Sequence, residues 1–99
     1  MLHTVNKSPF ERNTLESCLR HAKKGSAILL IEDGVYGALK GTTVSGKVNE
    51  AMKSVTVYAL RPDIEARGVQ NRVLDGIKLV DYGGFVDLVT EHNATQSWL

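Results

Sequence analysis

The sequence has little cysteine, little proline and no long apolar run. Cys18 is the single cysteine among 99 residues, so an internal disulfide framework and a multi-cysteine zinc site are both excluded. A lone thiol suits a reducing compartment, and we expect the protein to act in the cytoplasm. No apolar run approaches the roughly 18–20 residues that span a bilayer. The N-terminal residues also lack the basic-then-apolar layout of a signal peptide.

An excess of charge of one sign is also missing. Lys and Arg number 12 against 11 Asp and Glu, which gives a formal net charge of +1. This balance predicts no general attraction to nucleic acid or to an anionic membrane, so we expect the partners to be other proteins. The length fits one domain over residues 1–99, because domains commonly hold about 100–150 residues.

What the sequence does contain is a series of short apolar runs. The clearest is 27–31, and residues 55–60 and 77–80 are similar, with a shorter first run at 2–5. Short runs rich in β-branched residues are typical of strands buried on both faces of a parallel sheet. We therefore predict strands at these positions.

Between these runs the apolar residues have helical spacing. Leu15, Cys18, Leu19 and Ala22 follow the i, i+3, i+4, i+7 pattern of a helix with one buried face. Asn13 is predicted to cap this helix, in a capping-box-like arrangement with the glutamate three residues later in the chain. Further helices are predicted over residues 35–39, 45–52, 62–68 and 82–90.

Strands and helices therefore alternate along the chain. This order predicts an α/β domain with a parallel sheet covered on both faces. The tail, residues 94–99, can add a fifth strand at an edge of the sheet. Because Trp98 lies in this tail and is large and apolar, we expect the tail to dock onto its own sheet or onto another subunit.

Cys18 is the first candidate for chemistry. A thiolate can attack sulfur and can carry a persulfide. Its ordinary pKa of about 8.5 falls only near a helix N-terminus or near cations, and Cys18 lies on the apolar stripe in the second turn of its predicted helix. A small buried core residue is the alternative interpretation, since free cysteine packs well among apolar side chains.

Two loops follow strands at the same edge of the predicted sheet. Residues 6–12 follow the first strand, and Glu32, Asp33 and Gly34 follow the second. Ligands of parallel α/β sheets bind beyond the carboxyl ends of strands, so the acidic turn could bind a metal, hydrogen-bond a ribose or act as a base. Asp-Gly is also a common turn, and Asp33 could instead cap the next helix. We expect the two loops to lie side by side, as a site or as an interface.

No other set of residues predicts a metal, a cofactor or a catalytic triad. His3, His21 and His92 are dispersed without the i, i+4 spacing of metal ligands. We expect His3, in the first strand, to be a hydrogen-bonded core residue. No Gly-x-Ser-x-Gly elbow and no glycine-rich phosphate loop occur, which also argues against a flavodoxin-like binder of a phosphorylated ligand.

Several segments together resemble the DsrH/TusB family over essentially the whole chain and in the same order. These segments are Leu2 to Phe10, Leu30 to Val35, Val57 to Leu60, Asp63, Ala66 to Gly68, Asp81-Tyr82, Gly84 to Val86 and Gln96 to Trp98. Within the family, residues 8–13 and the helix that follows look more like DsrH than TusB. DsrH proteins typically carry a cysteine in this helix, and Cys18 falls on that position.

The resemblance implies a subunit of a sulfur-relay complex. DsrE, DsrF and DsrH form a heterohexamer with two copies of each subunit, as do TusB, TusC and TusD. The implied fold is a three-layer α/β/α domain with a five-stranded parallel sheet. The complex carries sulfur as a cysteine persulfide and exchanges it with DsrC, or with TusE in the other branch. It needs no metal, flavin or nucleotide.

The resemblance also implies where the chemistry takes place. The principal persulfide cysteine belongs to the DsrE/TusD-type partner, and whether this chain is itself catalytic stays open. Cys18 is either an auxiliary sulfur-binding thiol or a packed core residue. We expect a DsrEFH-type subunit that serves sulfur oxidation. The alternatives are a TusB-type subunit in 2-thiolation of a tRNA wobble uridine and a non-catalytic assembly subunit.

Overall fold

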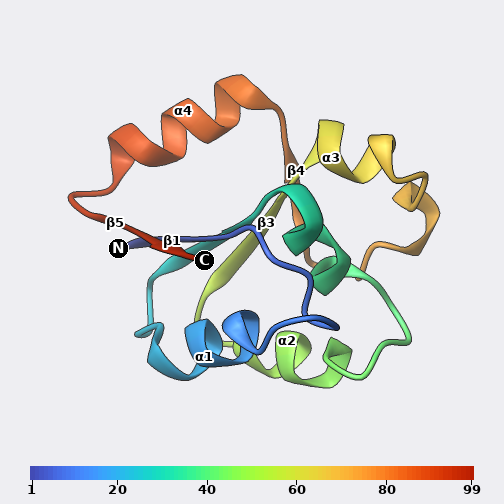
Figure 1. The fold of residues 1–99 in the computed structure, drawn as a ribbon. Helices are drawn as coiled ribbons and strands as arrows, with labels where there is room; N and C mark the ends of the chain where they lie inside the picture. The colour runs from blue at the N-terminus through green and yellow to red at the C-terminus, as the bar shows by residue number, and fades with distance from the viewer.

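The computed structural model describes residues 1–99 and contains one sheet surrounded by helices (Figure 1). Its elements, in chain order, are β1 (Leu2–Val5), α1 (Thr14–His21), β2 (Ala27–Leu30), the 3₁₀ helix η1 (Glu32–Ala38), α2 (Ser45–Ala51), β3 (Thr56–Leu60), α3 (Arg61–Ala66), the 3₁₀ helix η2 (Gln70–Arg72), β4 (Lys78–Val80), α4 (Tyr82–Glu91) and β5 (Thr95–Trp98). The strands predicted from the apolar runs are confirmed. The helix predicted at 35–39 is instead a 3₁₀ helix that begins directly after β2.

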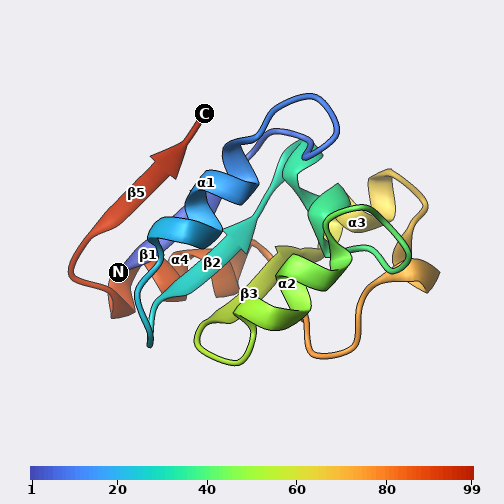
Figure 2. The same cartoon turned by 90° about the horizontal axis from the view of Figure 1, so that it is seen from below.

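The five strands form a single parallel sheet in the order β4-β3-β2-β1-β5. The tail is confirmed as a fifth strand at an edge, where Leu2 aligns with Thr95 and Val5 with Trp98. Figure 2 shows β5 alongside β1, and the two termini therefore belong to neighbouring strands. No helix of the structure is long and apolar enough to cross a membrane.

Helices cover both faces of this sheet, which confirms the three-layer α/β/α architecture. Figure 1 shows α1 and α2 on one side of the sheet and α4 on the other. Strand residues alternate between these faces, as they do in any extended chain. In β2, for example, Ile28 and Leu30 belong to the larger core, whereas Ala27 and Leu29 belong to the smaller one. Because both faces are apolar, the strand sequences are continuous apolar runs.

The two cores differ in size. The larger one, on the side of α1 and α2, holds 14 buried residues, including Leu15, Cys18 and Val48. The smaller one holds four, and Leu88 is the buried contribution of α4 to it. Most of the apolar area that stabilises the fold is therefore buried on the α1/α2 side.

Helix capping differs from the sequence prediction at α1. Asn13 occupies the N-cap position but makes no side-chain capping hydrogen bond, so the predicted capping box is wrong. The cause lies in the backbone, because φ of −92° and ψ of 18° at Asn13 depart from the extended conformation that an N-cap normally adopts. A side-chain cap does form at α4, where Asp81 Oδ1 accepts a hydrogen bond of 2.8 Å from Gly84 N–H.

Candidate functional site

Cys18 lies in the second turn of α1 and points into the larger core. Its exposed fraction is 0%, and it packs in the same cluster as Leu15 and Ile28. Burial raises the pKa of the thiol to about 12, because the thiolate loses its hydration there. The apolar-stripe interpretation is confirmed, since the side chain is a packed core residue. In this conformation the thiol is protonated at neutral pH, and a sulfur-binding role for Cys18 stays a prediction.

The acidic turn after β2 is held by Arg67, the residue directly after α3. Arg67 donates to Asp33 Oδ1 from Nη2 at 2.8 Å and from Nε at 3.1 Å, and its Nη1 donates to the carbonyl oxygen of Asp63 at 3.1 Å. The Asp63 carboxylate in turn accepts a hydrogen bond of 2.7 Å from the backbone N–H of Glu32. The Asp33 hydrogen bond is the main cause that raises the pKa of Arg67.

This arrangement addresses two of the options for Asp33. The carboxylate is neither a helix cap nor a member of a metal cluster, because η1 has no side-chain cap and no group of three or more His, Cys, Asp or Glu side chains lies close enough together to hold a metal ion. It instead anchors α3 to the turn after β2. The sequence contained one signal of this network, since Asp63 and Arg67 are spaced i, i+4 in a predicted helix.

Two features confirm that the loops after β1 and β2 lie side by side. Ile31 N–H donates to the carbonyl oxygen of Val5 at 3.0 Å. A Cβ at Gly34 would collide with that same oxygen and lie 3.4 Å from the Cα of Asn6. The two backbones are thus in direct contact, and glycine is required for this approach.

The C-terminal tail docks onto its own sheet through Trp98. Its indole Nε1–H donates to His3 Nδ1 at 3.0 Å, and the indole ring centroid lies 6.1 Å from that of His3 and 5.8 Å from that of His21 in α1. His3 is 4% exposed, which confirms it as a hydrogen-bonded core residue. Burial lowers the pKa of His3, so the ring is held in its neutral form with the proton on Nε2.

Most of the chain matches a known family. Residues 7–95 match the family described as "DsrH like protein". This chain belongs to the DsrH/TusB family. It is 38% identical over 98 residues to "Protein TusB" of Pectobacterium parmentieri, and the match covers 99% of this chain and 100% of that protein. The "Protein TusB" of Shigella flexneri is 35% identical over 98 residues, with the same coverage.

Solved structures agree with this fold. The ychN protein of E. coli superposes with a TM-score of 0.81 at 15% identity, and the match covers 97% of each chain. At this identity the likeness establishes the fold alone. The family relatives add information about the branch, because their name favours TusB over the DsrEFH type that the cysteine position suggested. The matching family model is itself described by the DsrH name, so the comparisons establish the family and leave the branch to a proposal.

Proposed function

We propose that this protein is a TusB-type subunit of a cytoplasmic sulfur-relay complex that acts in 2-thiolation of a tRNA wobble uridine. The observation that carries the proposal is the 38% identity to a protein named TusB across 99% of this chain and 100% of that one. A match of that extent covers every strand and helix of the fold, so it does not depend on one shared motif.

In this proposal the chain supports the transfer, and the principal persulfide cysteine belongs to a TusD-type partner. Two observations favour a supporting role. The only thiol of the chain is fully buried, with its pKa raised to about 12. The loop edge at which α/β proteins usually hold ligands is occupied by the ion pairs of Arg67 with Asp33 and Asp63.

A role for Cys18 as an auxiliary sulfur carrier requires α1 to open, because sulfur transfer needs an accessible thiolate. Incubation of the purified complex with a persulfide donor, followed by mass spectrometry of each cysteine, tests this role. Modification of the partner alone, together with full activity of a Cys18→Ala variant, would show that Cys18 is a core residue. Persulfide on Cys18 would establish the carrier role.

A surface on α4 supports assembly with other subunits. Tyr82, Val86 and Val89 are spaced i, i+4, i+7, so they lie on one side of the helix, and they are 61%, 61% and 41% exposed. An exposed apolar stripe of this kind is typical of a protein interface. We propose TusC-like and TusD-like subunits as partners, in a heterohexamer with two copies of each, and a TusE-like protein as the sulfur acceptor.

The DsrEFH type remains a second candidate, because the matching family is described by the DsrH name and Cys18 occupies the position of the DsrH cysteine. In that case the complex exchanges sulfur with a DsrC-like protein during sulfur oxidation. The two candidates differ in the phenotype of a strain that lacks this gene.

The deciding experiment is deletion of the gene followed by analysis of tRNA nucleosides. The TusB-type proposal expects wobble 2-thiouridine to disappear and to return when the intact gene is restored. A Cys18→Ala gene is the matched complementing variant and is expected to restore the modified nucleoside if the cysteine only packs. Unchanged 2-thiouridine, together with loss of growth on reduced sulfur, would contradict the TusB type and favour the DsrEFH type.

A further inference from the structure

A cavity of about 490 Å³ opens beside the amino ends of β1 and β2, next to the last turn of α1. His3, His21, Ser26, Gln96 and Trp98 contribute to its walls, and Lys23 and Lys24 follow the end of α1 at its rim. Volumes of this size are common for small-molecule sites. It lies at the amino ends of the strands. Ligands of parallel α/β proteins usually bind at the opposite, carboxyl ends.

Two buried side chains leave hydrogen-bonding groups free in this cavity. The chain buries four polar residues, and Thr4 and Ser8 place their hydroxyl groups in hydrogen bonds within the protein. Ser26, which is 6% exposed, has no partner for its hydroxyl, and His3, which is 4% exposed, bonds through Nδ1 only. These two groups are therefore available to bond to water or to a bound ligand.

The free groups face the cavity and are not sealed in the core. Asn6 Oδ1 is the only side-chain oxygen or nitrogen that is shut off from solvent without a hydrogen-bond partner. Ser26 Oγ and His3 Nε2 are therefore accessible to solvent, and both residues line this cavity. His3 Nδ1 accepts the indole proton of Trp98, so the neutral ring carries its own proton on Nε2 and presents a donor.

The charge of the cavity selects the ligand. Lys23 and Lys24 line it, and no aspartate or glutamate does. Neither lysine forms a salt bridge, in contrast to Lys47 with Glu16 and Lys53 with Glu50. His21 Nδ1 lies 2.8 Å from the carbonyl oxygen of Ser17 and must donate to it.

We propose that this cavity binds a phosphoryl group, with the Ser26 hydroxyl and His3 Nε2–H as buried donors and Lys23 and Lys24 as the cations at its rim. The group is either free phosphate or part of a small organic molecule, for which the Trp98 indole offers an apolar wall. Hydrogen-bond donors, paired positive charge and the absence of carboxylates are the features that recognise a doubly charged oxyanion. The site uses side chains in place of a glycine-rich phosphate loop, so the sequence patterns for such loops do not reveal it.

Trp98 makes the test direct, because it is the only tryptophan of the chain. The full-length protein is titrated with inorganic phosphate, with adenosine monophosphate and with uncharged adenosine at constant ionic strength. The single indole N–H resonance and the tryptophan fluorescence report binding. We expect a saturable response to phosphate or to the nucleotide and none to adenosine. A tighter response to the nucleotide assigns an organic phosphate, and a response to phosphate alone assigns the free ion.

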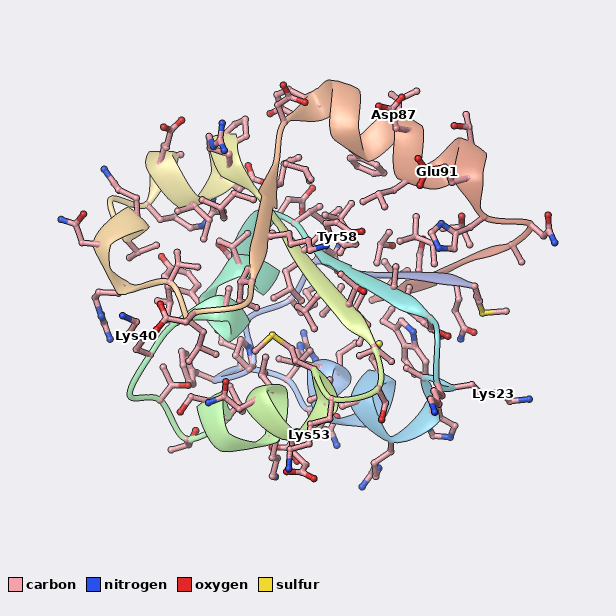
Figure 3. The ribbon with its side chains drawn as sticks, turned by 180° about the vertical axis from the view of Figure 1, so that it is seen from behind. Lys23, Lys40, Lys53, Tyr58, Asp87 and Glu91 are labelled. Carbon is pink, nitrogen blue, oxygen red and sulfur yellow. The ribbon has the colours of Figure 1, made fainter.

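Variants localise the binding. The Ser26→Ala variant and the double variant Lys23→Gln, Lys24→Gln are each expected to weaken binding about tenfold or more, because a charge-assisted hydrogen bond is lost. Lys53→Gln is the matched control, because Figure 3 places Lys53 at α2 and Lys23 beyond α1 at a separate corner of the molecule. No saturable response to either anion, or equal affinity in all variants, would overturn the proposal. An equal response to adenosine would also overturn it.

Discussion

The two ends of the strands in the parallel sheet differ in their polar contacts; we call them the carboxyl edge and the amino edge. At the carboxyl edge, the turn after β2 contacts the backbone of β1, and Arg67 pairs with Asp33 and Asp63. At the amino edge, the hydroxyl of Ser26 and one ring nitrogen of His3 remain without protein partners beside an open cavity. At the strand ends that usually bind ligands in this class of fold, the acidic turn is paired within the chain, but Asn6 Oδ1 after β1 is buried without a hydrogen-bond partner. At the amino ends, Ser26 and His3 carry polar groups that have no protein partner but are not sealed from solvent.

The largest expected effect comes from breaking the contact at the carboxyl edge. We expect Gly34→Ala to lower the free energy of unfolding by about 3 kcal/mol, because the new Cβ collides with the carbonyl oxygen of Val5 and backbone must move. Urea denaturation followed by circular dichroism measures this change. The matched control is Gly46→Ala in α2, where a Cβ meets nothing within 4 Å and alanine favours the helix. Equal stability of the two variants would show that β1 and the turn after β2 do not depend on this close approach.

The same contact shows how far sequence alone can describe this protein. The strands were predictable because both faces of the sheet are buried, which makes runs such as 27–31 continuously apolar. The burial of Cys18 was also predictable, from its place on the apolar stripe of α1. Each of these properties depends on neighbours within a few residues in the chain.

The pairs that define the two edges were not predictable, because they join distant parts of the sequence. Asp33 and Arg67 are 34 residues apart, and His3 and Trp98 are 95 residues apart. The strand order brings them together, and periodicity does not reveal strand order. The predicted Asn13 cap failed for a similar reason, since the backbone at Asn13 adopts φ and ψ values that its residue type does not determine.

A smaller effect is expected from unpairing the acidic turn without altering the backbone. Arg67→Ala leaves the Asp33 and Asp63 carboxylates without their cation, and we expect a loss of about 1–2 kcal/mol in the free energy of unfolding. The Arg67 side chain is only 22% exposed, so water replaces the lost hydrogen bonds incompletely. Chemical denaturation of Arg67→Ala and Arg67→Lys gives the test, because lysine keeps the charge but not the planar fork that holds Asp33.

Arg12→Ala provides the control for this comparison, because Arg12 is exposed and forms no salt bridge. We expect its stability to stay within about 0.5 kcal/mol of the wild type, as for most surface substitutions. A loss as large as that of Arg67→Ala would mean that the network at the carboxyl edge contributes no more than an ordinary surface cation.

The smallest expected effect concerns pH and the amino edge. Burial places the pKa of His3 below its ordinary value of 6.5, so in this range the unfolded chain binds a proton more readily than the folded one. Stability from the neutral ring is therefore complete above about pH 6.5 and is lost as the pH falls through this value toward the lower pKa of the folded state. Thermal unfolding of the wild type and of His3→Gln at pH 7.5, 6.5 and 5.5 measures this contribution, and the variant is expected to show the shallower decline.

His92→Gln serves as the control for removal of a histidine outside the cavity. The same decline in the wild type and in His3→Gln would mean that burial does not lower the pKa of His3.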